Sequence, residues 1–279
     1  MPSEKRARQR AAREARLAAE AQAAKRRRQI RNAIIVVVVA GAIVGIAFAV
    51  SSGNNPVGNQ SKTSTTLSQA AKTNAHLQAE ANAAAVKAGC PSSPTKPANQ
   101  QHYTAAPAMT IDTTKSYSAT VVTTTGTFVI GLNAQAAPKT VNNFVFLADK
   151  GFFHCNSFFR VIPGFVNQTG NPAQTNASST KSGASYTLPA ENLPPAGSAG
   201  KPAYPNGAVA MATSSAGVSG SQFFIVAGPQ GQSLPSSYPL FGLVTSGLNV
   251  VQTINQQGST SGIPPAVTQR ILSITIHES

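Results

Sequence analysis

The stretch FFRVIPGFVNQTG, residues 158–170, places a single arginine, Arg160, inside an apolar run that breaks at Pro163 and Gly164 and ends beside the amide of Gln168. Pro-Gly is a turn signal, and the aromatic and β-branched residues on both sides predict two short strands, 157–161 and 166–169. A guanidinium stays charged in proteins, so it lies in apolar surroundings only where something compensates it. The stretch therefore predicts a β-hairpin with either a surface ion pair or a functional arginine.

The segments on both sides of this hairpin extend the β pattern. A Thr-Gly turn within 117–133 predicts a hairpin, and further short strands are expected at 208–212, 222–227, 240–244 and 271–277. Residues 183–207 are rich in glycine and proline and predict a long surface excursion. Many short strands with glycine and proline between them indicate an all-β domain, an antiparallel barrel or sandwich.

Two segments have the apolar stripe of a helix that covers a core. The stripes are Val141, Phe144, Val145 and Ala148 in residues 137–151, and Leu248, Val251 and Ile254 in residues 246–256. Pro138 suits a first helical turn, and Gly151 stands just beyond the end of the first segment. We expect these two helices to cap the core.

The N-terminus differs in composition from the rest of the chain. Eleven of the 22 Lys and Arg residues fall between Lys5 and Arg31, against only Glu4, Glu14 and Glu20, so +8 of the formal +14 lies in a tail of residues 1–32. No aromatic residue interleaves these cations, which argues against nucleic acid as a partner. A solvated tail is the simplest interpretation, and binding to anionic lipid headgroups is an alternative.

Residues 33–50, AIIVVVVAGAIVGIAFAV, carry no charge and have about the length that spans a bilayer as a helix. Because the positive charge precedes them, the positive-inside rule predicts a plasma-membrane anchor with a cytoplasmic N-terminus and an extracytoplasmic remainder. A cleaved signal peptide ending at Ala47-Phe48-Ala49 is the alternative.

Residues 51–106 are mainly Ser, Thr, Asn, Gln, Ala and Pro, which predicts a polar, Ala-rich linker. Within it, residues 67–89 have the alanine content and terminal glycine of a helix, with His76 on its solvated surface. The predicted organisation is therefore tail 1–32, anchor 33–50, linker 51–106 and folded domain 107–279.

The two cysteines, Cys90 and Cys155, both follow the predicted anchor, on the side where disulfides persist. We expect one bridge, which would pin the linker to the domain and add roughly 4 kcal/mol by the loop-entropy estimate. Separate buried thiols are the alternative. A metal or nucleophilic role for the His154-Cys155 pair has no second pair of ligands to support it.

Four segments occur in the order and spacing of one known family. They are residues 137–152, 158–170, GAVAMATSSAGVSGSQFFIV at 207–226, and LPSSYPLFGLV at 234–244. From about Tyr117 to the C-terminus the chain resembles the cyclophilin-type peptidyl-prolyl cis-trans isomerases, and its N-terminal extension resembles membrane-anchored bacterial members. The resemblance implies a closed eight-stranded antiparallel barrel with a helix over each end and an active groove on its outside.

The resemblance also implies the site residues. Arg160 matches the catalytic arginine, Phe165, Val166 and Phe224 the walls of the proline pocket, and Gln168 and Gln222 the amides that hold the peptide. The remaining matched positions in the groove are Met211, Ala212, Thr213, Ser214, Leu234 and Tyr238. Neither a metal nor another cofactor is implied.

The residue types suit the chemistry independently of the family. Amide resonance imposes a barrier of about 20 kcal/mol on rotation of a prolyl bond, and no bond is made or broken. An apolar slot can hold the proline ring while a charged donor stabilises the pyramidal nitrogen that appears as resonance is lost. A permanently charged arginine beside phenylalanines meets both requirements.

Some positions depart from the family pattern. Phe159 and Tyr238 stand where histidine is usual, Thr169 replaces a glycine, and Thr213-Ser214 replaces Asn-Ala.

We expect an isomerase that assists folding of extracytoplasmic proteins, with proline-containing peptides and unfolded envelope proteins as partners, acting as a monomer. The alternative that these departures favour is a weakly catalytic module that binds proline-containing segments.

Overall fold

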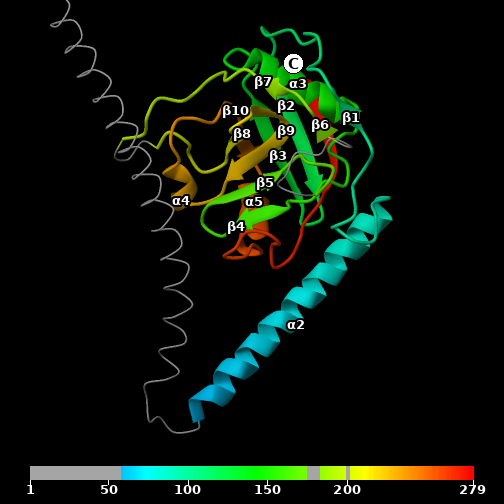
Figure 1. The fold of residues 1–279 in the computed structure, drawn as a ribbon, viewed down its shortest axis with the longest axis vertical. Helices are drawn as coiled ribbons and strands as arrows, with labels where there is room; N and C mark the ends of the chain where they lie inside the picture. The colour runs from blue at the N-terminus through cyan, green and yellow to red at the C-terminus, as the bar shows by residue number, and fades with distance from the viewer. Residues whose placement is uncertain (1–57, 175–182, 199–201) are drawn as a thin grey trace, which may run out of the picture. The chain divides into compact units, whose positions relative to one another are not determined.

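The computed structural model describes residues 58–174, 183–198 and 202–279, with side chains from residue 69 onward. Residues 67–279 form a compact unit that holds the sheet, called the second unit below (Figure 1). The predicted basic tail and membrane anchor lie outside the described residues. Among the helices that are described, none combines the length and the apolar character needed to cross a bilayer.

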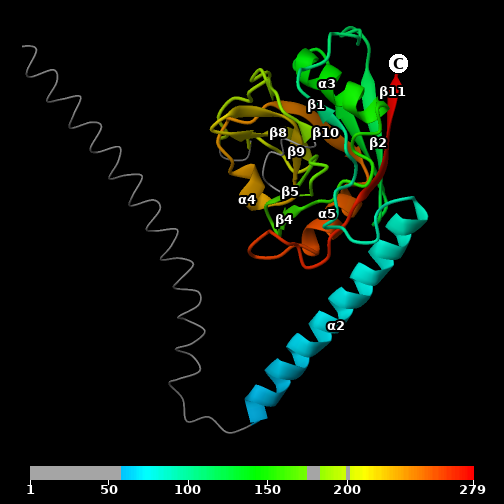
Figure 2. The ribbon, with the colours of Figure 1, turned by 45° about the vertical axis from the view of Figure 1, so that its right-hand side comes forward.

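One antiparallel sheet dominates the second unit, in the order β11-β2-β3-β10-β8-β9-β5-β4 with β7 added on β9. It curls around the core, so that β2 and β11 lie on the opposite side from β8 and β9 (Figure 2). The strands are β2 (Tyr117–Thr123), β3 (Thr127–Leu132), β4 (Arg160–Ile162), β5 (Val166–Thr169), β7 (Thr187–Leu188), β8 (Ala208–Ser214), β9 (Gly217–Val226), β10 (Leu240–Ser246) and β11 (Ile271–Glu278).

The two end strands of the sheet, β11 and β4, do not form a ladder with each other. The segments leading into these two strands, 155–158 and 269–271, are joined by an isolated bridge between Ser157 and Arg270 and by neighbouring backbone hydrogen bonds. The outer edge of β4 is occupied instead by a loop, because Val161 N–H donates to Gly262 O and Ser259 N–H donates to Val161 O. The expected closed eight-stranded barrel is therefore not formed as a continuous ladder.

Both predicted helices cover the core. In α3 (Pro138–Asp149) the side chains of Val141, Phe144 and Leu147 are buried, and α5 (Leu248–Gln256) buries Val251 and Ile254. The ring of Phe144 lies 5.2 to 5.6 Å from those of Phe153, Phe223 and Phe241. Such an aromatic cluster carries much of the apolar burial of a domain of this size. A third short helix, α4 (Pro229–Gln232), follows β9.

The first turn of α3 is capped from a distant segment. Ala137 at the N-cap offers no side-chain acceptor, and the Glu191 carboxylate accepts from Thr140 N (2.9 Å), Thr140 Oγ1 (3.0 Å) and Lys139 N (3.2 Å) instead. A carboxylate at a helix N-terminus satisfies unpaired N–H groups and complements the helix dipole.

We therefore expect Glu191→Ala to lower the free energy of unfolding by about 1 kcal/mol. Urea unfolding followed by circular dichroism measures the change, with Glu80→Gln on the exposed surface of α2 as the control. A Glu191→Ala midpoint no lower than that of the control would contradict the capping role.

The segment before the sheet is attached to it. The helix predicted at 67–89 is longer in the structure, α2 (Gly58–Lys87), and its end is joined to the domain by a Cys90–Cys155 disulfide, as the sequence predicted. Ala98 N–H donates to Pro172 O and Asn99 Nδ2 donates to Phe152 O. Strand β1 (His102–Tyr103) then pairs in parallel with β6 (Gly183–Ala184).

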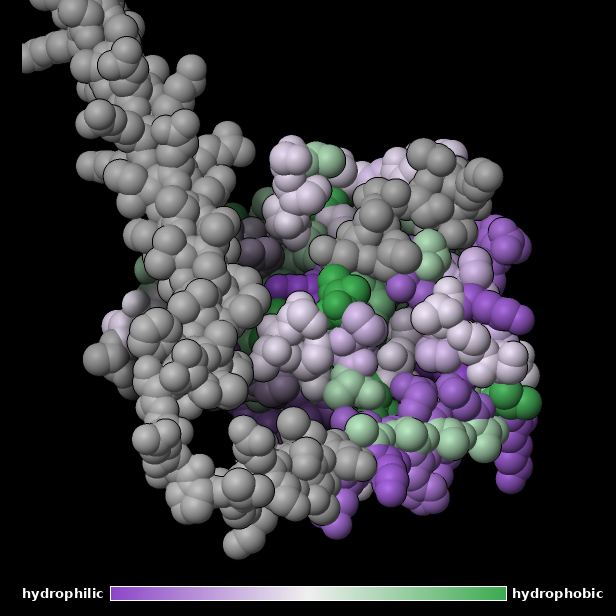
Figure 3. All heavy atoms as spheres, turned by 60° about the horizontal axis from the view of Figure 1, so that its bottom comes forward, coloured by the Kyte–Doolittle hydropathy of each residue, from purple (hydrophilic) through white to green (hydrophobic). Residues whose placement is uncertain are grey.

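The compact unit thus begins at Leu67, and the boundary that the sequence predicted at residue 107 lies inside it. Polar contacts and the disulfide make much of this attachment, together with small apolar contacts of Ala85 and Tyr103, so no apolar stripe in the sequence reveals it. On the face shown in Figure 3, hydrophilic residues predominate and apolar ones form small separate areas, which is ordinary for a folded domain.

Candidate functional site

Three neighbouring strands bring the predicted site residues together in one row. Arg160 on β4 pairs with Gln168 on β5, and Gln168 pairs with Phe224 on β9. Directly opposite residues in neighbouring strands point to the same face of a sheet. The register of the hairpin therefore places a guanidinium, an amide and a phenyl ring side by side.

Hydrogen bonds hold the polar members of this row. Arg160 Nη1 donates to Gln168 Oε1 at 3.1 Å, and Gln168 Nε2 donates to Gln222 Oε1 at 3.1 Å. The guanidinium carbon also lies 5.7 Å from the centre of the Phe165 ring, within reach of a cation–π contact. Arg160 is thus held by an amide on one side and an aromatic face on the other.

The row forms one side of a pocket of about 260 Å³ on the sheet surface. Every residue that lines the pocket was among the predicted site residues: Arg160, Phe165, Val166, Gln168, Ala212, Thr213, Phe224, Leu234 and Tyr238. Its base is apolar, since Val166 and Phe224 are almost fully buried. The rings of Phe224 and Tyr238 meet edge to face at 5.3 Å.

Strand β8 contributes two consecutive residues to the pocket because its register with β9 shifts between Met211 and Thr213. This irregularity lets both Ala212 and Thr213 line the pocket. Met211 points the other way, pairs with Phe223 and is 2% exposed in the core. The structure therefore does not bring Met211, which the sequence placed in the groove, to the pocket.

A second hollow of about 390 Å³ adjoins the first and shares Gln168, Ala212 and Thr213 with it. Ser214 and Gln222 line this second hollow, together with Tyr186. Of the three predicted groove residues absent from the first pocket, Ser214 and Gln222 are therefore found next to it and Met211 is not. The two hollows together form a groove that has room for more than one residue of an extended peptide.

The charge of Arg160 is not paired with a carboxylate among the described residues. Burial lowers the pKa of Arg160 from its ordinary value, and nearby Tyr238 opposes this shift. A guanidinium still remains protonated at neutral pH. The pocket therefore presents a fixed positive charge and directed N–H donors next to an apolar surface.

The turn that carries Phe165 is fixed by helix α5. Asn255 Oδ1 accepts from Gly164 N (2.8 Å), and Asn255 Nδ2 donates to Ile162 O (2.9 Å) and to Asn167 Oδ1 (2.8 Å). Gly164 adopts φ 74°, a left-handed conformation that favours glycine. Pro163 and Gly164 thus form the predicted turn.

Sequence reasoning missed one supporting residue, Tyr204. Its hydroxyl accepts from Tyr238 N and donates to Tyr238 O, both at 2.9 Å, and the side chain is fully buried. The only sequence signal is a large aromatic in the excursion 183–207, between Pro202 and Pro205. Tyr204 fixes the backbone of Tyr238 where that residue forms the pocket wall.

Tyr204→Phe keeps the ring and removes this hydroxyl. Because two backbone groups of Tyr238 lose their partner, we expect the free energy of unfolding to fall by about 1 to 2 kcal/mol. Urea titration measures this loss in the free energy of unfolding. Tyr103→Phe is the matched control, since the Tyr103 hydroxyl bonds only to the side chain of Gln101 in the described part of the chain, and an equal loss in both variants would refute the specific role of Tyr204.

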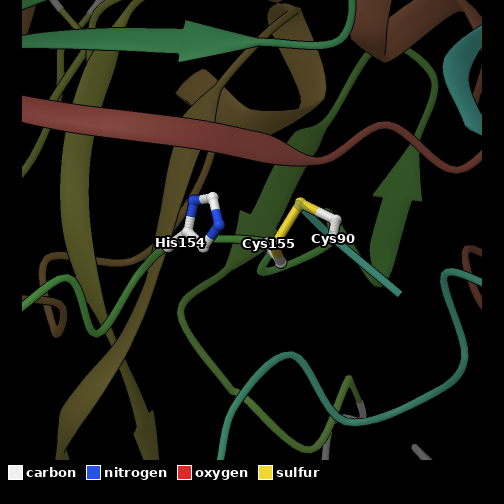
Figure 4. A group of neighbouring side chains, drawn as sticks. All are labelled: Cys90, His154 and Cys155. Atoms are coloured by element: carbon white, nitrogen blue, oxygen red, sulfur yellow. A yellow bond between two sulfur atoms is a disulfide. The ribbon is translucent and has the colours of Figure 1, made fainter. Parts of the chain in front are cut away.

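The sulfurs of Cys90 and Cys155 and a ring nitrogen of His154 lie within 4.8 Å of one another (Figure 4). In the disulfide the sulfurs are bonded to each other and lack the thiolate charge that binds a metal. His154 Nδ1 is instead 2.6 Å from Leu272 O. This group therefore links two segments and does not extend the site.

A family model described as "Cyclophilin type peptidyl-prolyl cis-trans isomerase/CLD" matches residues 118–276. The chain belongs to this family. It is therefore an enzyme of the cyclophilin type, a peptidyl-prolyl cis-trans isomerase. The match spans β2 to β11 and includes every residue of the pocket.

Two relatives in sequence agree with this assignment. The chain is 41% identical over 125 residues to "Peptidyl-prolyl cis-trans isomerase B" of Bacillus subtilis (44% of this chain, 80% of the relative). It is 34% identical over 158 residues to "Peptidyl-prolyl cis-trans isomerase-like 1" of Aspergillus niger (56% of this chain, 92% of the relative). A crystal structure of a cyclophilin-type isomerase from Cryptosporidium parvum aligns over 59% of this chain and 99% of its own, at 25% identity and a TM-score of 0.47.

Proposed function

We propose that this cyclophilin-type isomerase acts through Arg160, which stabilises the pyramidal prolyl nitrogen while the apolar pocket holds the proline ring. The observation that supports this most directly is the position of the guanidinium, hydrogen-bonded to Gln168 at the edge of a pocket based on Val166 and Phe224. As the bond twists, the nitrogen lone pair is released from resonance and becomes an acceptor. A donor fixed beforehand at that place stabilises the transition state more than the planar ground state.

The other pocket residues have supporting roles in this proposal. Phe165, Leu234 and Tyr238 enclose the ring from the open side, and the Tyr238 hydroxyl can meet a peptide polar group. Gln168 keeps the guanidinium in place and, with Gln222, offers amide groups to the peptide backbone. Ala212, Thr213 and Ser214 line the groove beyond the pocket, where the residue before proline would lie.

We further propose that the protein is an anchored bacterial member that assists folding of extracytoplasmic proteins. The uncharged residues 33–50 after a basic tail support an anchor with the domain outside, and the Cys90–Cys155 disulfide fits an oxidising compartment. Its partners in this proposal are proline-containing segments of unfolded secreted or envelope proteins. It works as a monomer, with no cofactor and no nucleic-acid partner.

The mechanism is tested with the full-length chain and a proline-containing tetrapeptide, whose cis-to-trans conversion is followed with and without protein. We expect the approach to equilibrium to accelerate in proportion to protein concentration. Tight peptide binding with negligible turnover would overturn the catalytic proposal and favour the alternative of a binding module. The location is tested by adding protease to intact spheroplasts, because only an extracytoplasmic domain would be cleaved.

A further inference from the structure

The strand that carries Arg160 depends on a loop for its outer edge. Val161 N–H donates to Gly262 O (3.0 Å), and Val161 O accepts from Ser259 N–H (3.1 Å). The loop also lies close to the arginine side chain, because a Cβ added at Gly262 would meet Arg160 Cγ at 3.5 Å. The aliphatic part of Arg160 therefore lies beside this loop, which is below β4 and α5 in Figure 2.

The loop, residues 257–270, is a connected unit. Gln257 O accepts from Val267 N–H (3.0 Å), and Gln257 Oε1 accepts from Gln269 Nε2 (2.6 Å), so its two ends are tied together. Ser259 Oγ donates to Pro264 O (2.7 Å) across its middle. A displacement at the end of the loop is therefore transmitted to residues 259–262.

The C-terminal end of this loop is held by α2 and the residues just after it. Gln78 Oε1 accepts from Thr268 N–H (2.7 Å), Arg270 Nη2 donates to Asn82 Oδ1 (3.0 Å), and Arg270 Nη1 donates to Pro91 O (2.6 Å). Gln78, Asn82 and Pro91 all precede residues 118–276, which the isomerase family model matches. A segment outside the family domain thus contacts the loop that supports its proposed catalytic strand.

The contact between α2 and the loop includes a buried guanidinium, that of Arg270. Its side chain is 1% exposed, and no carboxylate pairs with it among the described residues. A buried guanidinium needs acceptors, and among the described residues those of the Arg270 side chain are Asn82 Oδ1 and the backbone carbonyl of Pro91. If α2 left its place, the Arg270 guanidinium would have to find other partners and Thr268 N–H would lose Gln78 as its acceptor, although Thr124 also bonds the backbone of Arg270.

We propose that Gln78, Asn82 and Arg270 are positioning residues for Arg160, through which the docked end of α2 holds the 257–270 loop against β4. This inference rests on the proposed role of Arg160 in catalysis. It assigns to the helix before the family domain a part in setting the rate of the isomerase.

The test compares the full-length chain with the Gln78→Ala/Asn82→Ala variant. If these residues position a group that acts in the transition state, kcat falls by about threefold to tenfold at nearly unchanged KM. Hydrogen exchange of the Val161 amide accelerates by about tenfold, while that of Val121 in β2 stays the same. Gln69→Ala, which removes an amide from the exposed surface of the same helix, is the matched control and changes neither quantity.

A conservative variant separates positioning from stability. Asn82→Asp keeps an oxygen acceptor for Arg270 and should restore kcat and the exchange of Val161 toward the wild-type values. A lower Tm with unchanged kcat and Val161 exchange would show a structural role only and overturn the inference. If Arg160→Ala retains full activity, the proposed function fails, and the exchange of Val161 still reports independently on the contact with α2.

Discussion

Arg160→Ala is expected to lower kcat/KM for a proline-containing tetrapeptide by about a hundredfold to a thousandfold, the usual loss when one preorganised donor is removed from a transition state. The guanidinium is fixed by Gln168 and by the ring of Phe165, so it is already oriented when the peptide arrives. Alanine removes both the charge and the N–H groups. The apolar base of the pocket, Val166 and Phe224, remains in place, so peptide binding should change less than kcat.

The experiment needs a charge-matched control outside the pocket. Lys150→Ala removes a cation that lies over the Phe146 ring and does not line the pocket, and it should leave kcat/KM unchanged. Arg160→Lys keeps the charge but not the planar fork, and it should recover only part of the rate. Equal kcat/KM for wild type and Arg160→Ala would refute the proposed mechanism.

The Cys90→Ser/Cys155→Ser variant is expected to lose about 4 kcal/mol of the free energy of unfolding, by the loop-entropy estimate for a bridge across 65 residues of sequence. Both sulfurs are nearly inaccessible and pack with Ala85 at the end of α2. Without the bridge the unfolded chain gains conformational freedom, while the folded state keeps its other contacts.

Urea titration of oxidised wild type, reduced wild type and the double variant measures this contribution. The reduced wild-type chain should match the double variant, because both lack the bridge. A difference between the oxidised and reduced chains below about 0.5 kcal/mol, the scatter of ordinary surface changes, would contradict the estimate.

Local patterns predicted the hairpin and the helices around the site, while the resemblance implied the site residues themselves. The Pro163-Gly164 turn fixes the register of its hairpin, and register alone then places Arg160 opposite Gln168. The helices 138–149 and 248–256 follow from apolar stripes and from Pro138 at the first turn. In each case the residues that decide the structure are close together in the sequence.

The features that were missed depend on contacts between distant segments. No periodicity in residues 183–207 shows that Tyr204 would bond to Tyr238, or that Glu191 would cap α3. Met211 was predicted to line the groove but lies in the core. The sequence does not show where the register between β8 and β9 shifts, and this shift decides which residues face the groove. The ladder expected to close the barrel is replaced at Val161 by hydrogen bonds to a loop. These bonds join backbone groups, so the residue types do not predict them.

The pairing of β11 with β2 has a consequence for how the molecule acquires its structure. These neighbours are the first and the last long strands of the sheet, Tyr117–Thr123 and Ile271–Glu278. Their ladder can form only after residues 271–278 have left the ribosome, and pairing between strands so far apart in sequence favours slow folding. Until residues 271–278 have been made, this isomerase therefore has one long strand, β2, that lacks one of its two neighbours.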